Sequence, residues 1–207
     1  EMAARISSLY IGGGTPTILP GDQLAGVIGE VSRVFPLAED CEITVEANPG
    51  TIDREKLQAV AAAGVSRLSL GAQSLDPTLL RSMGRIHGRR EIDSAFDLAR
   101  ELRLAVNIDL IYAFPGQTPE TWKQTLREIT EMAPEHISAY ALKVEEGTPL
   151  AFEIASGTTV PCSEEVDAAM YEEAVSMLTS QGYQHYEISN FARPGCQSRH
   201  NRNYWEN

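Results

Sequence analysis

The chain has 207 residues, of which 43% are hydrophobic and 22% charged, a composition typical of a globular protein with one sizeable core. Its formal net charge of −12 argues against binding to a phosphate backbone, so we expect no nucleic-acid partner. No apolar stretch approaches the length of a membrane span and the first residues lack a signal-peptide pattern, so we expect no stable membrane insertion.

Strand-like runs alternate with amphipathic stretches along the first 150 residues. The pattern predicts strands at residues 6–11, 42–46, 67–71, 106–112 and 136–144. It predicts helices at residues 22–35, 53–63, 77–83, 91–102 and 119–132. Strands that recur at intervals of roughly 25–40 residues, with helices between them, indicate βα units and a parallel sheet.

The pattern changes beyond residue 150. Residues 164–180 form a long helical pattern, 186–191 a short extended segment, and 199–207 a polar and aromatic ending without a cap or a core pattern. We therefore expect a barrel unit at residues 1–150 and a helical extension at 151–207 that leads to a further domain. Because the chain begins with glutamate and ends without a recognisable element, we expect it to be a fragment.

Cysteines are few and widely spaced. Cys41, Cys162 and Cys196 support neither a disulfide framework nor a closed metal site, and we expect each to be a packing or surface residue. This usage fits a reducing compartment and predicts a cytoplasmic protein.

Several predicted strands end in residues that suit a ligand. Three consecutive glycines, residues 12–14, follow the first strand and allow a ligand to approach the backbone, although a tight turn would need them too. Glu46, Gln73 and Asp109 stand at the carboxyl ends of the next three strands, and Ala141 in the fifth. In a parallel barrel these ends share one rim, where ligands bind.

Each of these polar residues also has a structural interpretation. Asp109 lies in an apolar strand and could form an inward salt bridge or cap a loop, whereas Glu46 would share a face with Glu42. Gln73 could bond to loop backbone, and Arg85 could be a surface charge. Together, however, the groups suit a ligand with an amine, a carboxylate, a vicinal diol and an aromatic base, as in S-adenosylmethionine.

The order of five motifs resembles the radical SAM proteins related to oxygen-independent coproporphyrinogen III oxidase. The motifs are YIGGGTP (10–16), VEANPG (45–50), RLSLGAQS (67–74), GRIH (84–87) and NIDLIYAFPGQT (107–118). Two later motifs, YEISNFARPG (186–195) and SRHNRNYW (198–205), are similar to the HemW branch, whose members are regarded as heme chaperones.

The resemblance implies an α/β fold, a partial (β/α)6 TIM-like barrel that holds S-adenosylmethionine and a [4Fe-4S] cluster. It places Gly13 and Gly14 along the methionine amino group and Ala141 on the adenosine side. It assigns the polar groups of methionine and ribose to Glu46, Gln73, Arg85 and Asp109. His200 becomes the candidate heme ligand, since a neutral imidazole suits iron, with a surface histidine as the alternative. A heme-acceptor protein would then be a partner.

One departure from the family pattern limits these expectations. The family holds its cluster with a Cys-x3-Cys-x2-Cys loop after the first strand, and this chain contains no such triplet. We therefore expect the first barrel strand to be missing, the cluster to be bound only in the full-length protein, and no metal ligand or catalytic residue in this chain. Three functions remain open: a heme chaperone, a coproporphyrinogen III oxidase that decarboxylates propionate side chains, and an unrelated phosphate- or nucleotide-binding barrel without iron.

Overall fold

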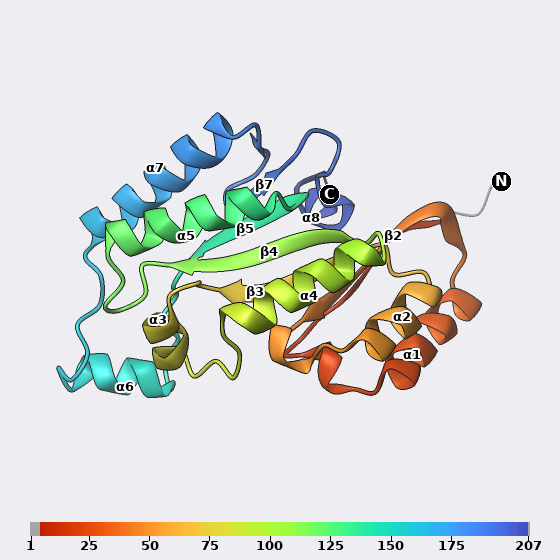
Figure 1. The fold of residues 1–207 in the computed structure, drawn as a ribbon, viewed down its shortest axis with the longest axis horizontal. Coiled ribbons are helices and arrows are strands. Elements are labelled where there is room, and N and C mark those ends of the chain that lie inside the picture. Colours follow the sequence, from red (N-terminus) through yellow and green to blue (C-terminus); the bar gives the residue numbers. More distant parts are fainter. Residues whose placement is uncertain (1–4, 207) are drawn as a thin grey trace.

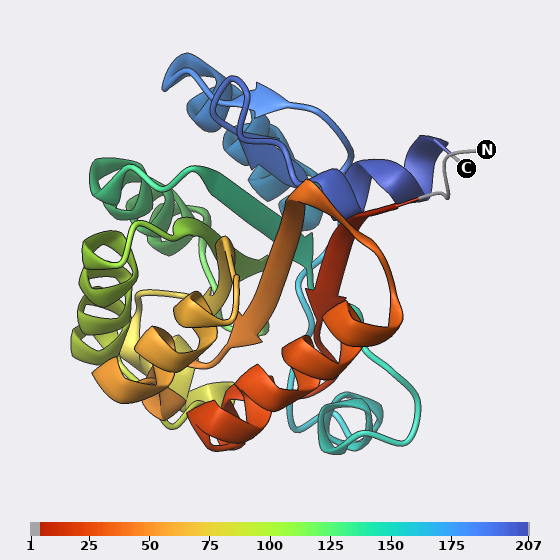
Figure 2. The same ribbon diagram turned by 90° about the vertical axis from the view of Figure 1, so that its right-hand side faces the viewer.

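The computed structural model describes residues 5–206, which form a curved seven-stranded sheet with helices on its convex side (Figures 1 and 2). Five parallel strands stand side by side in chain order: β1 (Ile6–Ile11), β2 (Leu37–Ala47), β3 (Arg67–Gln73), β4 (Ala105–Tyr112) and β5 (His136–Ala141). Next to β5, β7 (Asn190–Ala192) and then β6 (Gln184–His185) add antiparallel pairings. The predicted partial α/β barrel is confirmed.

Most helices connect successive strands. They are η1 (Pro16–Ile18), α1 (Gly21–Val34), η2 (Pro49–Thr51), α2 (Arg54–Ala62), α3 (Pro77–Ser82), α4 (Arg89–Glu101), α5 (Pro119–Met132), α6 (Pro149–Ala155), α7 (Glu164–Ser180) and α8 (Arg199–Glu206). Local signals explain where several begin: Asp53 caps α2 by accepting from the Lys56 N–H at 2.7 Å, and Pro119 follows the capping residue Thr118 at the start of α5.

The core lies between the convex face of the sheet and the helices. Outward side chains of the strands, such as Val45, Leu70, Ile108 and Ile137, are all fully buried there. Each buried aliphatic side chain contributes about 1.5–3 kcal/mol relative to exposure. The inward residues at alternate positions are polar instead, so the concave face is a polar channel and not a second apolar core.

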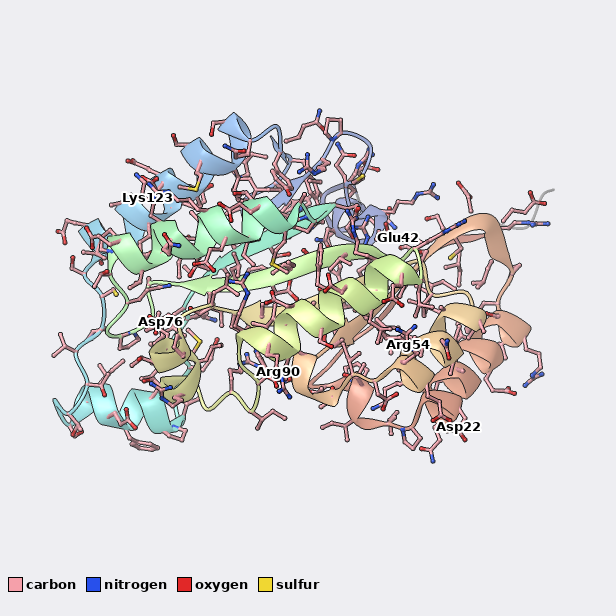
Figure 3. The ribbon with its side chains drawn as sticks, in the orientation of Figure 1. Asp22, Glu42, Arg54, Asp76, Arg90 and Lys123 are labelled. Atoms are coloured by element: carbon pink, nitrogen blue, oxygen red, sulfur yellow. The ribbon has the colours of Figure 1, made fainter. Side chains whose placement is uncertain are left out.

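The segment beyond residue 150 joins the same core. Trp122 of α5 is fully buried and its Nε1–H donates to the Met170 carbonyl of α7 at 2.8 Å. Lys123, labelled in Figure 3, pairs with Glu173 across the same two helices. We propose, as before, that residues 1–150 form the barrel unit and residues 151–207 an extension of it.

Three local predictions need correction. Residues 199–206, in which the sequence shows no core pattern or cap, form α8; β2 begins at Leu37 rather than at residue 42; and β5 ends at Ala141 rather than at residue 144. Residues 149–155, for which we made no prediction, form α6. Neither α6 nor α8 contains a fully buried residue, so neither carries the apolar periodicity from which a helix is predicted. Of residues 186–191, only Asn190 and Phe191 belong to a strand.

Candidate functional site

A cavity of about 510 Å³ opens at the carboxyl ends of the parallel strands. Six of the eight residues selected from the sequence line it, namely Gly14, Glu46, Gln73, Arg85, Asp109 and Ala141. Tyr140, which precedes Ala141 at the end of the fifth strand, also lines it, as do Tyr10, Ser69 and Lys143, which the sequence did not single out. The strand ends therefore do converge, as the rim of a parallel barrel requires.

Glu46 and the glycine loop form one side of the cavity. The Gly13 N–H donates to Glu46 Oε2 at 3.1 Å, and the Tyr10 hydroxyl donates to Oε1 at 2.9 Å. A Cβ atom on Gly12 would lie 2.7 Å from the Glu46 carboxyl carbon, so this position admits only glycine without moving Glu46. Gly13 and Gly14 have φ values of +95° and +91° and open space where a Cβ would stand, which leaves their backbone free to meet a ligand.

Asp109 lies inside the channel and forms neither a salt bridge nor a helix cap within residues 5–206. Its Oδ2 accepts from the Ser69 hydroxyl at 2.8 Å, and its Oδ1 accepts from Asn107 Nδ2 at 2.8 Å. Burial raises the pKa of Asp109 to about 6, with Glu46 adding to the effect, while the hydrogen bonds from Ser69, Ser138 and Asn107 oppose it. The carboxylate is thus available to accept from a ligand hydroxyl.

Gln73, the last residue of β3, and Arg85, in the loop that follows α3, also line the cavity. The Arg85 backbone N–H donates to the Leu80 carbonyl at 2.9 Å, but within residues 5–206 its guanidinium forms no hydrogen bond or ion pair. Burial lowers the pKa of Arg85, while the charge of Asp109 opposes that shift. A half-buried guanidinium of this kind is suited to bind a carboxylate. Gln73 has a φ of +68° at an irregularity in the β3–β4 register, an unusual backbone for a residue with a side chain.

His200 lies outside this cavity, in α8 beside Ser8 and Tyr10 of β1. Its ring stacks on Tyr10 with centroids 4.9 Å apart, and its Nδ1 is 3.3 Å from the Ser8 hydroxyl oxygen. Burial lowers the pKa of His200, which favours the neutral imidazole. Tyr10 therefore contacts both Glu46 of the cavity and His200 of α8.

The donor set fits S-adenosylmethionine but does not fit an iron-sulfur cluster. Carboxylates, an arginine and bare glycine backbone match the amine, carboxylate and diol of the former. In the part of the chain that the structure describes, no three His, Cys, Asp or Glu side chains are grouped to hold a metal, and Cys41, Cys162 and Cys196 are free and apart. Residues 5–206 also include no helix long and apolar enough to cross a membrane.

Comparison with known proteins defines the class. A family model described as the radical SAM superfamily matches residues 1–129, and the chain belongs to this superfamily. The solved structure of Escherichia coli coproporphyrinogen III oxidase (HemN), titled a radical SAM enzyme, aligns with a TM-score of 0.80 and 31% identity over 92% of this chain and 44% of that one. The resemblance to this superfamily is therefore confirmed, and an unrelated nucleotide-binding barrel is excluded.

Within the superfamily the chain is HemW-like. It is 39% identical to the heme chaperone HemW of Escherichia coli K12, over 97% of this chain and 52% of that protein. It is 38% identical to the mitochondrial radical S-adenosyl methionine domain-containing protein 1 of Bos taurus, over 98% of this chain and 46% of that protein. The chain thus spans about half the length of the curated relatives it matches.

Proposed function

We propose that the intact protein binds S-adenosylmethionine in the cavity at the carboxyl ends of β1–β5. The observation that supports this most is Arg85, a half-buried cation without a partner in residues 5–206, facing a cavity that also contains Glu46 and Asp109. Arg85 would bind the methionine carboxylate. Glu46, together with Gly13 and Gly14, would bind the methionine amino group. Gln73 and Asp109 would hold ribose hydroxyls, and Ala141 would lie beside the adenosine.

The bound cofactor would bring a cleavable sulfonium group, and the residues of this chain would bind and orient it. Superfamily membership implies a [4Fe-4S] cluster in full-length relatives. No residue of this chain is assigned to that cluster, because the grouped thiolates it needs are not found within residues 5–206.

We further propose that the protein is a heme chaperone in which His200 ligates heme iron. Its Nδ1 faces Ser8, so the ring is held in place by one nitrogen while Nε2 has no hydrogen bond within residues 5–206. A neutral imidazole held in this way suits an iron ligand. A heme-acceptor protein would be the partner, and the three free cysteines support a cytoplasmic location.

A hemin titration of the intact protein tests the heme proposal. We expect a Soret shift in the parent protein and a loss of at least tenfold in heme affinity in His200→Ala. His185→Ala is the matched control, because His185 is an exposed histidine in β6 whose ring stacks on Phe191, rather than on β1 or α8, and whose Nε2 lies 3.1 Å from the Ile188 carbonyl oxygen. A heme affinity in His200→Ala equal to that of the control would contradict the assignment.

Coproporphyrinogen III oxidation is the second candidate function, favoured by the structural similarity to HemN. Anaerobic incubation of the intact protein with coproporphyrinogen III, a reductant and S-adenosylmethionine distinguishes the two candidate functions. Porphyrin fluorescence after oxidation, coupled to mass analysis for the loss of two carboxyl groups, reports the oxidase. We expect unchanged substrate in this assay; decarboxylated product would assign the protein to the oxidase function.

A further inference from the structure

Helix α8 is attached to the barrel by polar contacts rather than by apolar burial. No residue of α8 is fully buried, and Tyr204 and Trp205 are exposed. A short helix without an apolar face has little intrinsic stability, so its position depends on what its first turn contacts. Ser8 and Tyr10 of β1 contact the His200 side chain, whereas the backbone of the first turn contacts Glu42 of β2, labelled beside α8 in Figure 3.

One carboxylate oxygen of Glu42 meets the start of α8. Glu42 Oε1 accepts from the Arg199 N–H at 3.0 Å, from the Ser198 hydroxyl at 3.2 Å and, at a longer 3.4 Å, from the His200 N–H. The Arg199 and His200 N–H groups are among the backbone donors that a helix leaves unpaired at its first turn. A carboxylate at this position also interacts favourably with the helix dipole.

The other oxygen of Glu42 is held by Arg67 of β3. Nε and Nη2 of Arg67 both donate to Glu42 Oε2 at 3.1 Å, and Nη2 also donates to the Cys196 carbonyl at 2.9 Å. The side chains of Arg67 and Glu42 are only 7% and 11% exposed, so the pair is shielded from water. The pair therefore fixes both the loop that precedes α8 and the first turn of α8 to the sheet.

We propose that Glu42, supported by Arg67, is a positioning residue that holds the helix carrying His200 against β1. The role rests on the proposed heme function of His200, because the position of its backbone decides where the imidazole stands beside Tyr10 and Ser8. Five donors surround the two oxygens of Glu42. The side chain in Glu42→Gln has only one acceptor oxygen. Its amide NH2 group must therefore face either the donors at the start of α8 or the donors of Arg67, and the donors it faces lose their acceptor.

Glu42→Gln and Asp40→Asn form a matched pair for the test in the intact protein. Both remove one charge from β2 and both alter a contact to Arg199, but the Asp40 side chain is 72% exposed and its pair with Arg199 lies in solvent. Arg67→Lys serves as a second variant, because it keeps a positive charge but loses the forked contact to Glu42 and Cys196.

Amide hydrogen exchange of residues 199–206 is the first measurement. We expect exchange at least tenfold faster in Glu42→Gln and Arg67→Lys, and within twofold of the parent in Asp40→Asn. The second measurement is hemin titration with the low-spin electron paramagnetic resonance signal of the axial ligand. We expect at least fivefold weaker heme binding and a changed ligand signal in Glu42→Gln, with S-adenosylmethionine affinity within twofold of the parent.

The outcomes separate the two proposals. Exchange in Glu42→Gln and Arg67→Lys equal to that in Asp40→Asn overturns the positioning role, whatever heme does. If exchange is faster in Glu42→Gln but neither Glu42→Gln nor His200→Ala changes the heme spectrum, the heme function of His200 is overturned. The positioning role of Glu42 then has no bearing on heme binding.

Discussion

Asp109 is the residue whose chemistry depends most directly on its surroundings. With a pKa of about 6, its carboxylate is largely ionised at pH 8 and mostly protonated at pH 5. If the ionised form accepts from ribose hydroxyls, S-adenosylmethionine affinity should fall by roughly tenfold between pH 8 and pH 5. Calorimetric titrations across this range measure the effect.

The control for this pH dependence is Asp109→Asn. An asparagine keeps the shape and one acceptor but does not titrate, so its affinity should be lower at pH 8 and nearly flat across the range. The same pH profile in parent and variant would show that another group controls binding.

Gly12 provides a steric test of the same site. In Gly12→Ala, the new Cβ would stand 2.7 Å from the Glu46 carboxyl carbon and would displace that side chain from Gly13 and Tyr10. We expect S-adenosylmethionine affinity to fall about tenfold, the loss of one charge-assisted contact. Calorimetry measures the affinity, and circular dichroism checks the fold.

Gly26→Ala is the matched control for Gly12→Ala. Gly26 lies in α1 with no atom within 4 Å of the added Cβ, so the substitution should leave binding unchanged and stabilise the helix by up to about 1 kcal/mol. Equal affinity in the two variants would exclude the described role of Glu46.

The sequence located part of this site because Glu46, Arg85 and Asp109 are charged residues at or near predicted strand ends. It did not single out Tyr10 and Ser69, which lie one residue from apolar neighbours and look like ordinary strand residues. Their signal is the two-residue period: Tyr10 stands between Leu9 and Ile11, and Ser69 between Leu68 and Leu70, so that both point to the opposite face of the sheet from their apolar neighbours. The contact of Tyr10 with His200 joins residues far apart in sequence and needed the structure.

At the scale of elements, periodicity predicted those with an apolar face. Helix α5 has the predicted bounds because its buried residues follow the helical repeat and a proline marks its first turn. Helix α8 was missed because buried polar contacts from Glu42, which is 157 residues away from Arg199, hold it in place. No local pattern reports such a contact.

Strands β4 and β5 are linked by a buried polar chain that predicts a pH effect on stability. His136 Nδ1 lies 2.6 Å from Asn107 Oδ1, and its Nε2 lies 2.7 Å from the Tyr186 hydroxyl oxygen. Burial, with a smaller effect of Arg67, lowers the pKa of His136 to about 3. The folded protein therefore keeps this imidazole neutral, whereas the unfolded chain protonates it below a pKa of about 6.5.

Stability should consequently fall as the pH drops from 6.5 toward 3, because the unfolded state takes up a proton that the folded state does not. His136 should contribute a slope of up to about 1.4 kcal/mol per pH unit in this window. Urea unfolding of the intact protein and of His136→Gln at pH 7.0 and 5.5 measures it. Asp109 has the opposite effect below pH 6 but is present in both proteins. Equal pH slopes would contradict the assignment.

At the scale of the whole molecule, the parallel strands bring the ligand-type residues together at one end of a polar channel. Helix α8 lies toward the other end of this channel. Figure 2 shows the helices on the outside of the curved sheet, and the ligand-type residues line the cavity at the carboxyl ends of its parallel strands. The alternation of strands and helices predicted βα units and a parallel sheet, and the family resemblance implied the partial barrel. The alternation could not predict the antiparallel addition of β7 and β6, because these strands have only three and two residues.

The account depends above all on the cavity at the strand ends, and calorimetric titration of the intact protein with S-adenosylmethionine tests it directly. Asp109→Ala and Arg85→Ala should each weaken binding at least tenfold. Arg90→Ala should leave binding unchanged, because that side chain is 94% exposed at the start of α4 (Figure 3). Affinities of Asp109→Ala and Arg85→Ala that both equal that of the parent would contradict the assignment of this cavity to S-adenosylmethionine.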